Sequence, residues 1–88
     1  MTGSPYRIPK DVFAAQLAGE AVILHLDTKR YYRLNATGAE IWRGLEQGES
    51  RDEIVHRLAR EFTVDLETAG AEVDRLIADL RGARLLEP

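Results

Sequence analysis

The sequence predicts an α+β domain in which a three-stranded antiparallel sheet is followed by three helices. Up to Leu34, apolar and β-branched residues fall in short alternating runs separated by turn signals, which is typical of strands. After Asn35, the apolar spacing changes to i, i+3, i+4 and i+7 and does so three times, which indicates three amphipathic helices. We therefore expect a single domain over residues 1–88, with strands within about 12–34 and helices within about 36–82.

The strand region divides at two turn sequences, around Gly19 and around Thr28. The expected strands are Val12–Leu17, Ala21–Leu26 and Arg30–Leu34. Alternation predicts one packed face, formed by Val22, Leu24 and Leu26 of the second strand with Tyr32 and Leu34 of the third. The side chains expected on the opposite face are those of Ile23, His25 and Tyr31.

Each expected helix has an apolar stripe and a start signal. The stripes are Gly38, Ile41, Trp42 and Leu45; Val55, Leu58, Ala59 and Phe62; and Val73, Leu76, Ile77 and Leu80. Asn35 and Asp65 are suited to cap the first and third helices through their side-chain oxygens. Ser50 and Glu53 have the spacing of a capping box for the second helix.

The composition excludes several chemistries. The chain contains no cysteine, which rules out internal disulfides, thiolate metal sites and cysteine nucleophiles. The two histidines, His25 and His56, are too few for a histidine-rich metal site, and neither GxGxxG nor GxxxxGK occurs. Ser50 is better explained as a helix cap than as a nucleophile. We therefore expect no catalytic residue, no metal and no cofactor, and hence no enzyme.

Hydropathy and charge indicate where in the cell the protein works and which partners it has. No apolar run approaches the ~20 residues of a membrane span. The start, residues 1–4, lacks the basic and apolar regions of a signal peptide, so we expect a cytoplasmic protein with no membrane partner. Five basic residues face three acidic ones in residues 1–34, but seven face twelve in residues 35–88.

A small sheet with three helices suggests a winged helix-turn-helix, a fold that usually binds DNA. In that fold the third helix would enter the major groove. Its charged residues are Glu67, Glu72, Asp74 and Asp79 against Arg75 and Arg81. Because DNA affinity depends on basic side chains that contact phosphates, this acidic helix argues against a nucleic-acid partner. A DNA-binding transcriptional regulator is the alternative function.

The stretch from Ala21 to Trp42, AVILHLDTKRYYRLNATGAEIW, resembles the characteristic segment of PqqD-like proteins. These are the peptide-recognition elements of pathways that modify ribosomally made peptides. The likeness continues through Ser50–Ile54, Val64-Asp65, Leu76–Leu80 and Leu85-Leu86, and it covers roughly residues 6–87.

The resemblance implies a winged helix-turn-helix-like fold that binds the leader of a precursor peptide. The leader would add as an antiparallel strand to Arg30–Leu34 and lie in a groove against Leu66–Arg81. The hairpin from Leu26 to Tyr32 is closer to the free-standing proteins of lasso peptide clusters. Such a protein works there with a separate leader peptidase and a cyclase, and we expect a monomer or weak dimer.

The strand offers the first group of expected peptide contacts, because the last strand of a meander can present an unpaired edge to another chain. These residues are Arg30, Tyr31, Tyr32, Arg33 and Leu34. The two arginines would discourage pairing between copies and favour an acidic or polar guest. Tyr31 is equally compatible with simple half-packing, and core packing is the favoured alternative for Tyr32.

The third helix offers the second group, which consists of Gly70, Val73, Asp74, Ile77 and Arg81. We expect the shoulder with Ile77, Asp74 and Arg81 to border the groove, because the opposite shoulder is wholly polar. Gly70 would permit a close approach of the peptide, although a helix–helix contact explains it equally well.

Overall fold

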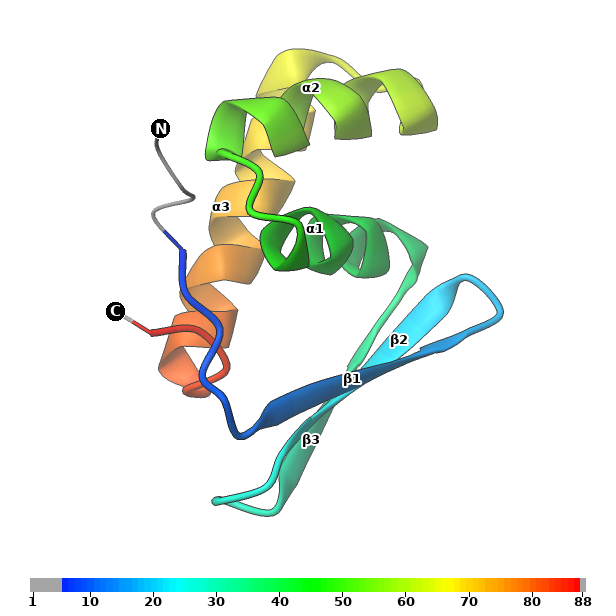
Figure 1. Ribbon diagram of the computed structural model, residues 1–88. Coiled ribbons are helices and arrows are strands. Elements are labelled where there is room, and N and C mark those ends of the chain that lie inside the picture. The colour runs from blue at the N-terminus through cyan, green and yellow to red at the C-terminus, as the bar shows by residue number, and fades with distance from the viewer. Residues whose placement is uncertain (1–5, 88) are drawn as a thin grey trace.

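The computed structural model describes residues 6–87 and contains a three-stranded sheet followed by three helices (Figure 1). The elements are β1 Val12–Leu17, β2 Glu20–His25, β3 Arg30–Leu34, α1 Ala36–Glu46, α2 Arg51–Phe62 and α3 Leu66–Gly82. The expected α+β class and element order are confirmed, whereas the likeness to a winged helix-turn-helix stays a prediction. Residues 1–4, used above for the expectation about a signal peptide, lie outside the described part. Within residues 6–87, no helix is long and apolar enough to cross a membrane.

The sheet is an antiparallel meander in the order β1-β2-β3. The β1–β2 turn consists of Ala18 and Gly19, whose φ angles of 49° and 84° are both positive. Two consecutive positive φ angles define the two-residue turn that matches the twist of a β-hairpin, and they explain the glycine. Sequential pairing leaves β1 and β3 at the two edges.

The helices begin at the residues that the sequence indicates. Asn35 Oδ1 accepts a hydrogen bond from Gly38 N at 2.9 Å, so the first cap is confirmed. Ser50 and Glu53 form the complete capping box, and the Asp65 carboxylate accepts from Thr68 N at 2.7 Å. These caps satisfy helix N–H groups that have no partner within the helix.

The core lies where the three helices meet the sheet. Figure 1 shows α1 next to the sheet, α2 on the far side of α1, and α3 running past α1 toward the sheet. The largest fully buried side chains are Trp42, Ile23, Ile41, Ile54, Leu58, Leu80, Leu85, Leu86 and Val73. Leu85 and Leu86 follow α3 and return to the core. The next residue, Glu87, is exposed, and its N–H donates to Arg7 O at 2.8 Å.

The expectation about the packed sheet face is wrong for β2. Ala21, Ile23 and His25 face the helices and are buried, whereas Leu24 and Leu26 are exposed. Both alternating sets of β2 are largely apolar, so periodicity alone cannot select between them. Figure 1 shows that the helices cover one side of the sheet, and the uncovered side carries exposed Phe13, Leu17, Leu24 and Tyr31.

The corrected face predicts different stability effects at two adjacent positions of β2. Ile23→Thr should lower the free energy of unfolding by about 2–3 kcal/mol, because it removes buried apolar volume and buries a hydroxyl. Leu24→Thr should cost less than about 1 kcal/mol, because Leu24 is 38% exposed. Chemical denaturation of both variants measures these values. Equal losses, or a larger loss at Leu24, would contradict the assignment.

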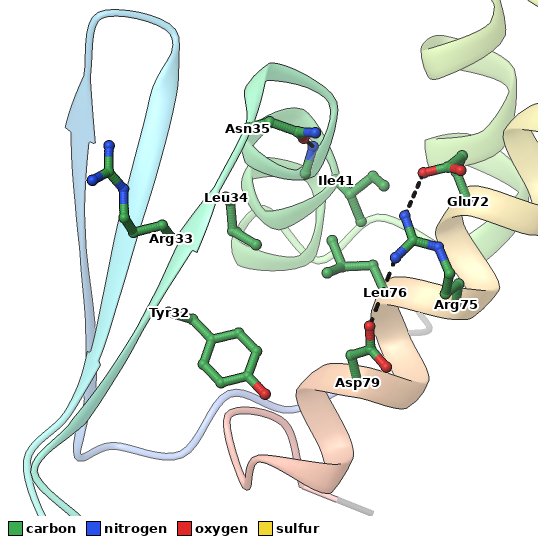
Figure 2. A pocket seen from close by; sticks show the side chains of 10 residues that line it. Tyr32, Arg33, Leu34, Asn35, Ile41, Glu72, Arg75, Leu76 and Asp79 are labelled. Atoms are coloured by element: carbon green, nitrogen blue, oxygen red, sulfur yellow. Dashed lines mark hydrogen bonds and ion pairs between the residues drawn. The ribbon is translucent and has the colours of Figure 1, made fainter.

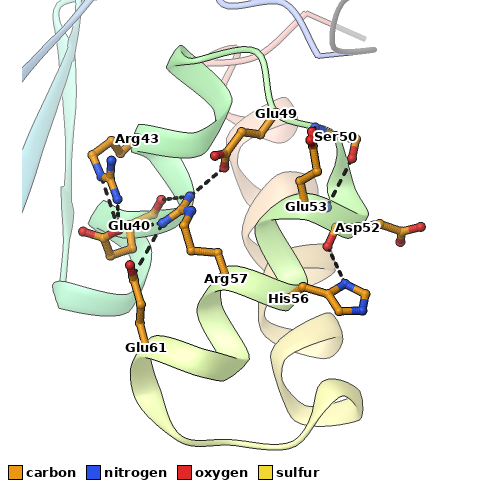
Figure 3. Close-up of polar contacts among 9 residues, drawn as sticks. All are labelled: Glu40, Arg43, Glu49, Ser50, Asp52, Glu53, His56, Arg57 and Glu61. Atoms are coloured by element: carbon orange, nitrogen blue, oxygen red, sulfur yellow. Dashed lines mark hydrogen bonds and ion pairs between the residues drawn. The ribbon is translucent and has the colours of Figure 1, made fainter.

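A charged cluster joins α1 to α2 (Figure 3). The Arg57 guanidinium binds Glu40 Oε1 at 2.7 Å and Glu49 Oε1 at 2.8 Å, and Glu61 lies 3.6 Å away. The Arg57 side chain is only 13% exposed, so these contacts are screened less than surface ion pairs. Hydrogen bonding to Arg43, aided by the charge of Arg57, holds the pKa of Glu40 below its ordinary value. The cluster therefore keeps Glu40 ionised and fixes α2 against α1.

Candidate functional site

Strand β3 has an open edge. One side of β3 pairs with β2, and no other strand of residues 6–87 pairs with its opposite side. An unpaired strand edge presents N–H and C=O groups that accept another strand. The expected edge for peptide addition is thus present.

The backbone groups at this edge belong to Tyr31 and Arg33. Leu26 N donates to Asp11 O at 2.9 Å, so even-numbered residues of β2 direct their backbone groups toward β1. Odd-numbered residues of β2 consequently face β3, where they pair with even-numbered residues. The odd-numbered residues of β3 are therefore left to turn their N–H and C=O groups outward.

A groove runs beside this edge, between β3 and α3, and α1 forms part of its floor. We call it the β3–α3 groove; its lining is Tyr32, Arg33, Leu34, Asn35, Gly38, Ile41, Glu72, Arg75, Leu76 and Asp79. In Figure 2, Tyr32 and Leu34 point from the strand toward the helices, opposite Ile41 and Leu76. The cavity measures about 190 Å³. This is below the roughly 300–1,000 Å³ of typical small-molecule pockets, so its size suits a side chain of a bound peptide.

The helix side of the groove is charged, and its floor is apolar. Arg75 donates to Glu72 at 2.7 Å and lies 3.8 Å from Asp79, as Figure 2 shows. Below this row, Leu34, Ile41 and Leu76 are each at most 9% exposed. A strand added to β3 would place alternate side chains over the apolar floor and beneath the charged row.

The five expected residues of β3 all lie on the edge strand, but their side chains point to different surfaces. Tyr32 and Leu34 face the groove. Tyr32 is 36% exposed, so the alternative that it packs in the core does not hold. Tyr31 and Arg33 project from the uncovered side of the sheet, where Arg33 lies 3.4 Å from Glu20. Arg30 is exposed at the start of the strand.

The expectation about the shoulder of α3 is not supported by the geometry. Asp74 faces α2 and binds Arg51 at 2.6 Å, and a Cβ on Gly70 would lie 3.0 Å from the same arginine. Val73 and Ile77 are buried in the core. None of these residues lines the β3–α3 groove, and the alternative explanation of Gly70 as a helix–helix contact fits the structure.

Arg81, the last residue expected on that shoulder, also lies away from the groove. Its guanidinium carbon is 5.4 Å from the centroid of the Tyr6 ring, which is the distance of a cation–π contact. The opposite shoulder, with Glu72, Arg75 and Asp79, lines the groove instead. Its polarity is the reason why the other shoulder was expected to border the groove.

The side chains that first invite a catalytic interpretation have structural partners. Ser50 Oγ accepts from Glu53 N, and His56 Nδ1 lies 2.8 Å from the carbonyl oxygen of Asp52 (Figure 3). His25 is buried, and its Nδ1 accepts from Asp27 N at 3.2 Å. Within residues 6–87, no group of His, Asp and Glu side chains is arranged to hold a metal ion.

Comparison with known proteins identifies the family. The model of coenzyme PQQ synthesis protein D, PqqD, matches residues 20–86, which include β2, β3 and all three helices. The chain belongs to the PqqD family. No protein with curated annotation matches the chain significantly.

Two solved structures of similar fold contain leader peptides. The structure described as TbiB1 in complex with the TbiA(beta) leader peptide is 36% identical, with a TM-score of 0.87. That match covers 92% of this chain and 94% of TbiB1. The structure described as lasso peptide synthetase B1 complexed with the leader peptide is 25% identical, with a TM-score of 0.86, and covers 94% and 98% of the two chains.

Proposed function

We propose that this protein binds the leader region of a ribosomally made precursor peptide by β-strand addition to β3. The open edge at Tyr31 and Arg33, beside a groove with an apolar floor, is the observation that carries the proposal. Main-chain hydrogen bonds to the edge would supply affinity, and the groove would select side chains. Membership of the PqqD family, and leader peptides in both similar structures, support the same function.

We further propose that the protein has no catalysis of its own and delivers the leader to a leader peptidase and a cyclase in the cytoplasm. The likeness to lasso peptide synthetase B1 favours lasso-type biosynthesis. Ser50 and His56 each bind a backbone group of α2 or its cap, which gives both side chains a structural role. The reaction chemistry would then belong to the partner enzymes.

Titration calorimetry with a synthetic leader tests the binding function. The peptide should carry the leader of the precursor whose reading frame adjoins that of this protein. We expect saturable binding of one peptide per chain, with a negative heat-capacity change because apolar surface is buried. Absence of binding would refute the proposal.

Mass spectrometry tests the absence of catalysis separately. The full precursor incubated with this protein alone should keep its mass, and cleavage should require addition of the peptidase. A cleaved or cyclised product without a partner would show that the protein is an enzyme.

A further inference from the structure

The charged groups along β3 and α3 are segregated by sign. At the carboxyl end of β3, the α3 row contains Glu72 and Asp79 with Arg75 between them. Arg75 forms ion pairs with both acids, and Arg33, the other basic residue of the lining, is paired with Glu20, so the α3 row has one negative charge in excess. We call it the acidic end of the groove.

The amino end of β3 has the opposite sign. A second cavity there is lined by Thr28, Arg30, Gly82, Ala83 and Arg84, and so lies between the start of β3 and the end of α3. Neither Arg30 nor Arg84 forms an ion pair with any other residue in the described part of the chain. We call these two arginines, Arg30 and Arg84, the basic end of the groove.

The acidic end and the basic end follow one another along β3 and α3. Arg30 and Tyr32 are two residues apart on β3, and Asp79 and Gly82 are separated by less than one turn of α3. The five residues of β3 extend over about 17 Å, so five or six residues of an added strand would span both ends. A single bound segment would contact both signs of charge.

The direction of the added strand determines which end of the peptide meets the acidic end of the groove and which meets the basic end. The sheet is antiparallel throughout, and antiparallel pairing is slightly more stable per residue than parallel pairing. A strand antiparallel to β3 enters beside Asn35 at the acidic end and leaves beside Arg30 at the basic end. Its amino-terminal part therefore meets Glu72 and Asp79, and its carboxyl-terminal part meets Arg84.

Resting on the proposed function, we propose that the protein selects leaders of one charge polarity. The segment that adds to β3 carries a basic side chain in its amino-terminal half and acidic side chains in its carboxyl-terminal half. Acidic groups at the carboxyl-terminal half fix the direction and register of the strand, which backbone hydrogen bonds alone specify weakly.

Charge reversal at the basic end tests this inference. Arg30→Glu and Arg84→Glu should each weaken binding of the adjoining precursor's leader about fivefold at low ionic strength, because attraction becomes repulsion. The effect should shrink in 1 M salt, where the screening length is about 3 Å. Calorimetry or fluorescence anisotropy measures the affinity of each variant for the leader at both salt concentrations.

Arg60→Glu is the matched control, because Arg60 is exposed on α2 and forms no ion pair with the other described residues. It changes the net charge by the same amount and should leave binding within about twofold of wild type. A leader with its carboxyl-terminal acids changed to Gln should bind wild type more weakly and respond little to Arg84→Glu.

The outcomes separate the two proposals. If the wild-type protein binds no leader, the proposed function fails. If the leader binds but Arg30→Glu and Arg84→Glu behave like Arg60→Glu, the polarity inference is overturned and leader binding stands. A bound leader without acidic residues in its carboxyl-terminal half would also overturn it.

Discussion

Replacing Arg33 with proline is expected to weaken leader binding roughly 30-fold or more while the domain stays folded. Proline has no N–H, and the Arg33 N–H points to the open edge, so the β2–β3 ladder keeps its hydrogen bonds. The added strand would lose one hydrogen bond and would bury a carbonyl group without a donor. That loss costs about 2–4 kcal/mol when the bond and the unpaired carbonyl are combined.

Arg33→Ala is the control for the side chain. It removes the exposed contact with Glu20 but keeps the backbone N–H, so affinity should stay within about threefold of wild type. Fluorescence of Trp42, the single tryptophan and 1% exposed, reports whether each variant is folded. If alanine and proline weakened binding equally, the side chain would carry the interaction and strand addition at Arg33 would be refuted.

Gly44→Ala is expected to cause the largest loss of stability, about 2–4 kcal/mol, or roughly 10–25 °C in melting temperature. A Cβ at Gly44 would lie 2.6 Å from Arg57 Nη2, 2.6 Å from Glu49 Oε1 and 2.8 Å from Ile54 Cγ1. Arg57 is held between acidic residues and Ile54 is fully buried, so neither can move freely. The clash outweighs the roughly 1 kcal/mol that alanine gains over glycine in a helix.

Gly82→Ala supplies the comparison, because a Cβ there meets nothing within 4 Å. It should leave the melting temperature unchanged or raise it slightly, since alanine restricts the unfolded chain. Thermal melts followed by circular dichroism compare the two variants. A Gly44→Ala protein as stable as wild type would show that α1 and α2 do not approach each other as closely as described.

Local signals in the sequence were sufficient to predict the elements. Asn35, Ser50 and Asp65 each bind backbone N–H groups within their own helix, so their effect depends on only a few neighbouring residues. The apolar stripes likewise gave the buried sides of the helices. Phe62 is the main exception, because it ends α2 and is 37% exposed.

Choices between two similar faces could not be made from the sequence. In β2, Ile23 and Leu24 are both apolar, and only the packing of α1 determines which is buried. On α3, periodicity separates the shoulder of Asp74 from that of Asp79, but it does not show that Arg51 of α2 binds the first while the second lies beside β3. Such outcomes depend on contacts between residues distant in sequence, which periodicity does not encode.

Hydrogen exchange at the amides of β3 tests strand addition most directly. In the free protein, the Tyr31 and Arg33 amides should exchange quickly, and the Tyr32 amide, paired with β2, should exchange slowly. Saturation with the leader should slow exchange at Tyr31 and Arg33 and leave Tyr32 nearly unchanged. Leader binding that left the Tyr31 and Arg33 amides exchanging quickly would contradict addition at this edge.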